Sequence, residues 1–151
     1  MSDITVSIYT PNITVEIPVG AQGPVAGRTG GVLISPTSGS PVSVGNSKAF
    51  FRVTSEMTGL TLQEVAAACS TAGTSGTTSI QIRRVRGGVS ADMLSTPLTI
   101  DANETDSSTA ATAAVIDAAN DDILTGDQIH FDLDAISDGS LGIYVAFTFN
   151  T

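Results

Sequence analysis

Short segments in which apolar and polar residues alternate recur along most of the 151-residue chain. In residues 128–134, for example, Ile129, Phe131 and Leu133 alternate with polar residues. A period of two gives a β-strand one apolar and one polar face. The clearest segments of this kind are residues 49–53, 79–85, 93–100, 128–134 and 141–149. Turn-forming residues separate them, so we predict an all-β fold, an antiparallel β-sandwich of the jelly-roll type.

Two apolar segments leave the choice between helix and strand open. In residues 60–71, Leu62, Val65 and Cys69 lie at helical spacing, and alanine favours helices. The same segment can also form a strand with small side chains, and residues 110–120 are ambiguous for the same reason. Pro97 interrupts the strand predicted at 93–100, where it requires a sheet edge or a bulge.

The apolar faces of these strands predict the core of the sandwich. The side chains expected to be buried are Phe51, Val53, Ile80, Ile82, Ile129, Phe131, Leu133, Val145 and Phe147.

The N-terminus carries two further alternating segments, residues 4–8 and 13–17, with a Pro-Asn turn signal between them. Two short strands are not stable alone in water, so their apolar face needs another surface. We predict that this extended arm binds another chain. The partner-binding residues would be Ile4, Val6, Ile8, Ile13, Val15 and Ile17.

Residues 20–45 are rich in glycine, proline and serine. Residues 20–25 (Gly-Ala-Gln-Gly-Pro-Val) form two collagen-like triplets, but Ala26 shifts the frame. Two or three triplets are too few for a triple helix, so a flexible linker is the simpler interpretation. The predicted organisation is an anchor arm with a collagen-like segment (1–31), a linker (32–44) and a β-sandwich domain (45–151).

The charge is strongly acidic and unevenly distributed. The chain has 15 acidic and 6 basic residues, a net charge of −9, which disfavours binding to nucleic acid and to anionic membranes. Residues 87–151 contain no lysine or arginine, whereas Arg83, Arg84 and Arg86 lie together. We expect these arginines to pair with the acidic C-terminal half, within or between subunits, rather than with phosphate. No signal peptide or membrane span is expected.

The residues that most enzymes use are scarce. His130, on a polar strand face, and Cys69, among alanines, are the only residues of their types. Aspartates near Asp132 do not follow the calcium-loop pattern, because Ile136 occupies the fifth position. Turn formation is the expected role of these aspartates, with a calcium site as the alternative. We therefore expect no enzyme activity, no cofactor and no metal site.

Several segments resemble virion appendage proteins of tailed bacteriophages. Residues 13–19 (Ile-Thr-Val-Glu-Ile-Pro-Val), followed by Gly-Ala-Gln-Gly-Pro, resemble the N-terminal anchor of tail fibre proteins. Residues 94–104, 110–116, 125–134 and 141–147 resemble a β-sandwich module of phage virion proteins. The resemblance implies a strand, not a helix, at residues 60–71. It also implies a homotrimeric head or tail fibre or decoration protein, located in the virion and attached to capsid or tail proteins. The interrupted triplets depart from the long shaft of fibre proteins, which implies a short appendage.

Two other classes of function are weighed against this one. A carbohydrate-binding module that recognises a host surface glycan would need exposed aromatic rings, but the chain has no tryptophan and only two tyrosines, Tyr9 and Tyr144. A glycosidase or polysaccharide lyase would need carboxylates that converge in a cleft, and no pattern in the sequence indicates such convergence.

Overall fold

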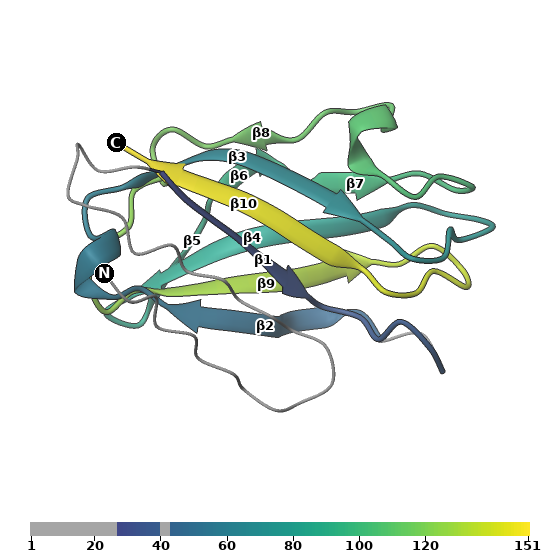
Figure 1. Cartoon of the computed structure of the whole chain (residues 1–151), viewed down its shortest axis with the longest axis horizontal. Coiled ribbons are helices and arrows are strands. Elements are labelled where there is room, and N and C mark those ends of the chain that lie inside the picture. Colours follow the sequence, from purple (N-terminus) through teal and green to yellow (C-terminus); the bar gives the residue numbers. More distant parts are fainter. Residues whose placement is uncertain (1–26, 40–42) are drawn as a thin grey trace, which may run out of the picture.

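The fold is built almost entirely from short antiparallel strands. The computed structural model describes residues 27–39 and 43–151 (Figure 1). The strands are β1 (Arg28–Leu33), β2 (Gly45–Arg52), β3 (Thr61–Ala68), β4 (Thr78–Arg86), β5 (Val89–Asp92), β6 (Leu94–Thr96), β7 (Leu98–Ile100), β8 (Val115–Ile116), β9 (Gln128–Ala135) and β10 (Tyr144–Asn150). Two single-turn 3₁₀ helices, η1 (Ser55–Met57) and η2 (Ser107–Thr109), lie in the connections.

The strands form two main sheets that pack against each other. One sheet has the order β1-β10-β3, and the other has the order β2-β9-β4-β5 with β7 also paired to β4. β6 and β8 form a small third sheet. Every pairing between these strands is antiparallel. The prediction of an all-β, antiparallel β-sandwich is confirmed.

The ambiguous segment 60–71 contains strand β3 and no helix. β3 pairs with β10 along most of its length, with a bulge opposite Thr148 and Phe149. This pairing buries Leu62 and Ala67 against the core and leaves Ala66 on the outer face. Pairing with a buried neighbour thus outweighs the helix propensity of the three alanines, and the strand implied by the family resemblance is confirmed.

Pro97 divides the strand predicted at residues 93–100. Leu94, before the proline, pairs with Ile116 of β8, whereas Leu98, after it, pairs with Ile80 of β4. Proline has no backbone N–H to donate to a ladder, so the chain leaves one sheet and joins another at this point. In the second ambiguous segment, residues 110–120, only the two residues of β8 form a strand.

The sandwich begins earlier than the sequence predicts. β1 lies across the predicted boundary between the arm (1–31) and the linker (32–44), yet it pairs with β10 in a continuous register from Arg28 to Leu33. Gly30 and Gly31 made this segment look like a loop, because glycine is unfavourable in strands. In the structure, both glycines leave room for aromatic side chains of β10. A Cβ atom on Gly30 would lie 2.7 Å from the Phe147 ring, and one on Gly31 would overlap the Tyr144 side chain.

The core lies between the two main sheets and is centred on aromatic rings. Phe51, Phe131, Phe147 and Phe149 lie in one cluster with ring centroids 5.3–6.4 Å apart. Eight of the nine side chains predicted to be buried are buried, at 0–9% exposure. The exception is Phe51, which is only half-buried, because its strand β2 is an edge strand.

Replacing Phe131 with alanine tests the core assignment. The ring is fully buried and packs against two other phenylalanines, so its loss leaves a cavity that the surrounding strands cannot fill. We expect Phe131→Ala to lower the free energy of unfolding by about 3–5 kcal/mol, measured by urea denaturation. A loss below about 1 kcal/mol would show that this face of β9 is not the core face.

Candidate functional site

The arginine cluster predicted to pair with the acidic half does so within the chain. Arg83 contacts Asp132, and Arg84 and Arg86 both contact Asp122. Arg84 and Arg86 follow the buried Ile80 and Ile82 on the core face of β4, whereas Arg83 lies on the opposite, outer face. The same strand therefore carries two separate ionic clusters, one on each face.

The first cluster, on the core face of β4, consists of Arg84, Arg86, Asp122 and Asp127. Arg86 donates through Nε and Nη2 to the buried carboxylate of Asp127, with N–O distances of 2.7–3.2 Å. The backbone N–H of Leu124 also donates to this carboxylate, at 2.8 Å. Burial raises the pKa of Asp127, but the hydrogen bonds from Arg86 and Leu124 outweigh burial and hold the pKa below its usual value. The hydrogen bond to Asp127 also raises the pKa of Arg86.

The second cluster lies on the outer face of the five-stranded sheet. Arg83 forms a two-point contact with Asp132, with Nε–Oδ2 and Nη2–Oδ1 distances of 2.6 and 3.1 Å. The Ser47 N–H donates to the same carboxylate at 2.5 Å, and the Ser47 hydroxyl accepts from Arg83 at 3.2 Å. Ser47 has a left-handed backbone (φ 56°) within the irregularity where β2 and β9 change register. The cluster therefore fixes a bulge in an edge strand.

His130 belongs to this second cluster through both ring nitrogens. Its Nδ1 lies 2.8 Å from the Ser47 hydroxyl, and its Nε2 lies 3.1 Å from Oε1 of Gln128. Because the Gln128 oxygen can only accept, Nε2 carries the proton and Nδ1 accepts from Ser47. Burial and the charge of Arg83 lower the pKa of His130, while Asp132 opposes them in part. The neutral ring is therefore the favoured form at neutral pH.

An exposed aromatic ring covers the histidine. Phe50 is 62% exposed and stacks on His130, with ring centroids 5.2 Å apart and planes at 14°. The register places Phe50 opposite His130, and Arg52 opposite Gln128, on the same face of the sheet. This face thus combines an aromatic surface with hydrogen-bonding side chains held in place by their neighbours.

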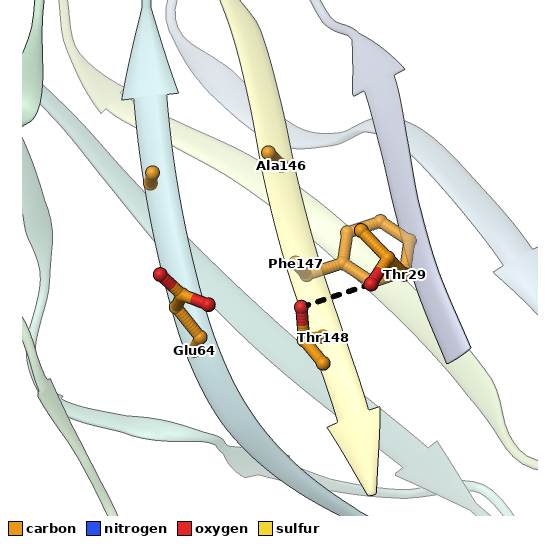
Figure 2. Close-up of a pocket in the computed structure, with 6 residues that line it drawn as sticks. Thr29, Glu64, Ala146, Phe147 and Thr148 are labelled. Carbon is orange, nitrogen blue, oxygen red and sulfur yellow. Dashed lines mark hydrogen bonds between the residues drawn. The ribbon is translucent and has the colours of Figure 1, made fainter. Parts of the chain in front are cut away.

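The three-stranded sheet has a shallow hollow on its outer face (Figure 2). Thr29, Glu64, Ala66, Ala146, Phe147 and Thr148 line it, and its volume is about 130 Å³. In Figure 2, Thr29 and Thr148 face each other across β1 and β10, joined by a hydrogen bond of 3.2 Å. Small-molecule sites usually have volumes of about 300–1,000 Å³, so this hollow is too small for most ligands.

One flank of the sandwich carries the edges of both sheets. β1 and β2 lie on the same side of the molecule in Figure 1, and β8 lies on the opposite side. At this flank, the Phe147 ring lies against the position that a Cβ atom of Gly30 would take, and it stacks on Phe51 at 5.3 Å. Phe51 and Val32 are only half-buried here, which leaves apolar surface at the open edge of the core.

The residues predicted to bind a partner through the arm (Ile4, Val6, Ile8, Ile13, Val15 and Ile17) lie outside the described residues. Within residues 27–39 and 43–151, no group of three His, Cys, Asp or Glu residues could hold a metal ion. Over the same ranges no helix is long and apolar enough to cross a membrane. Cys69 is buried. Asp122 and Asp132 bind arginines, whereas Asp127 binds Arg86 and also has the turn role expected of the aspartates, because it accepts from the Leu124 N–H at the turn of residues 124–127.

The fold and these surfaces define an antiparallel β-sandwich with internally paired charges. No family model, curated protein or solved structure matches the chain.

The His130 cluster predicts a dependence of stability on pH. Folding lowers the pKa of His130, so the unfolded chain takes up this proton more readily, and stability falls as the pH decreases from about 6.5 towards the folded value. The aspartates with lowered pKa values add a further loss at more acidic pH. We expect His130→Gln to be less stable at pH 7.5 but to show a smaller loss between pH 7.5 and 5.5, measured by urea denaturation. Equal losses in both proteins would contradict this assignment.

Proposed function

We propose that this chain is a structural component of a bacteriophage particle, a short surface fibre or decoration protein. The arm would attach it to another virion protein of the capsid or tail, and the sandwich would project outwards. The proposal rests first on the resemblance of residues 13–24 to fibre anchors and of residues 94–147 to a virion sandwich module.

The observation that best supports a structural role is the internal use of charge. Arg83, Arg84 and Arg86 are all bound to aspartates of their own domain, so these guanidinium groups are not free to hold a phosphate or an anionic substrate. Networks of this kind stabilise a compact module and fix its strands relative to one another. A domain exposed on a particle needs this rigidity more than it needs a cleft.

A homotrimer is the oligomeric state that we propose, because the resemblance to phage fibre proteins implies it. The arm would then have sister subunits as well as capsid or tail proteins within reach. Neither role requires a cofactor.

Attachment to particles tests the proposal. The full-length protein should be found by mass spectrometry in phage particles purified on a density gradient. A chain that starts at Gly27 keeps all of β1 and should fold, as judged by circular dichroism and thermal unfolding, but it should be absent from the particles. Attachment of this shortened chain at full-length levels would refute the anchor, and absence of the full-length chain from particles would refute a virion role.

A second candidate function is recognition of a host surface glycan, favoured by the exposed Phe50 ring on His130. Aromatic faces pack against apolar faces of ligands, and the neighbouring Arg52 and Gln128 offer hydrogen bonds to hydroxyl groups. If this face binds a glycan, Phe50→Ala should remove binding on an array of bacterial surface glycans, whereas Val89→Ala, at another exposed apolar residue, should not. Equal binding by the two variants would exclude this face.

A further inference from the structure

The outer edge of β1, on the side away from β10, pairs with none of the strands in residues 27–39 and 43–151. The Ile34 N–H donates to the Ile143 carbonyl at 2.8 Å, which fixes the alternation of the ladder between β1 and β10. In an antiparallel ladder, residue pairs that exchange backbone hydrogen bonds alternate with pairs that do not. Counting back from Ile34, the backbone groups of Val32 and Gly30 therefore form hydrogen bonds with β10. The N–H and C=O groups of Thr29, Gly31 and Leu33 therefore point away from β10, and among the described strands none pairs with that side of β1.

Two other edge strands, β3 and β2, are protected in ways that β1 is not. The free side of β3 forms isolated bridges from Thr61 to Asp122 and from Ala68 to Asp106. The edge strand β2 is interrupted by the bulge at Ser47. β1 has a continuous register, no proline and no bulge, and Arg28 is its only charged residue. Proteins usually protect exposed edges, so an unprotected edge indicates a place where another strand pairs.

The surface beside this edge fits a strand with one apolar face. Val32 and Phe51 are half-buried at the flank between β1 and β2, and Phe147 lies directly behind Gly30. A strand added next to β1 would direct every second side chain over this flank. Apolar side chains at those positions would bury Val32 and Phe51 further. Polar side chains at the alternate positions would lie on the outer face of the sheet, next to Thr29 and Thr148.

Residues 13–17 of the same sequence have this pattern. Ile13, Val15 and Ile17 alternate with Thr14 and Glu16, and four of the five residues are β-branched, which favours strands. The nine residues 18–26 connect this segment to Gly27, the residue that precedes β1. An extended chain of that length spans about 30 Å, which is enough to reach a neighbouring domain.

We propose that residues 13–17 of a second copy of this chain add as a strand to the outer edge of β1. This inference rests on the proposed function, because it names a sister subunit as a partner of the attachment arm. Exchange of arms around a closed ring of copies would pair the β1 edge of every subunit. Backbone hydrogen bonds would supply the attachment, and the Ile and Val side chains would set its orientation.

Hydrogen exchange of the full-length protein, measured residue by residue at low and high protein concentration, tests the pairing. In the monomer, Gly30 and Val32 should be protected and Thr29, Gly31 and Leu33 should exchange rapidly. At high concentration the second group should slow by about tenfold or more, in parallel with oligomer formation measured by sedimentation velocity.

Two matched variants of the arm separate strand addition from other contacts. Val15→Asp places a charge on the apolar face of the segment and should abolish both the oligomer and the added protection. Thr14→Asp places the same charge on the polar face and should leave both largely intact. Thr29→Pro removes one outward N–H and the side-chain hydrogen bond to Thr148 while sparing the backbone hydrogen bonds to β10, and it should weaken association from the β1 side.

Three results would overturn the inference. They are rapid exchange of Thr29, Gly31 and Leu33 in the oligomer, protection that does not change with concentration, and equal effects of the two arm variants. Protection independent of concentration would mean that the arm folds back on its own β1. If particles carry the protein while these three amides remain unprotected, the inference fails and the virion proposal stands.

Discussion

The ionic contacts of β4 tie this strand to β9, to the bulge of β2 and to the connection that precedes β9. Through Arg83, β4 is fixed to β9 and to the bulge of β2. Through Arg84 and Arg86, it is fixed to the connection that contains Asp122 and Asp127. The carboxylates of Asp127 and Asp132 are buried, and buried carboxylates are costly unless they are paired, so their contacts fix the register of β4 as well as its position. A shift of β4 by one residue would exchange its two faces and separate all three arginines from their partners.

The same requirement for close fit explains the glycines of β1. The Phe147 ring fills the space where a side chain of Gly30 would lie, and Tyr144 does the same for Gly31 on the other face. A Cβ atom on Gly30 would displace the packed Phe147 ring, and one on Gly31 would require the exposed Tyr144 side chain to move. Glycine, which weakens an isolated strand, here lets the strand fit beside these rings.

The sequence predicted those elements whose signal is local and missed those, such as β1, whose pairing depends on distant residues. Alternation at residues 128–134 identified β9 and its buried face, because hydrophobic burial dominates in a central strand. The pairing of β4 arginines with the acidic half followed from charge asymmetry, but the individual partners did not, since they depend on which loops meet at the end of the sandwich. β1 was missed because its pairing depends on rings more than 100 residues away. The bulge at Ser47 left no local signal, since serine there adopts a backbone normally associated with glycine or asparagine.

The distribution of charge also bears on how such a domain can attach to others. The arginines of β4 are used inside the domain, and the remaining surface is mainly acidic, so two copies repel each other through their side chains. Association then depends on interactions that carry no net charge: backbone hydrogen bonds at a sheet edge and the burial of apolar side chains. The β1 flank offers both, with backbone groups that no described strand pairs beside half-buried Val32 and Phe51. Repulsion elsewhere on the surface would disfavour other modes of contact, so in the proposed assembly the acidic composition and this edge would together favour one defined orientation.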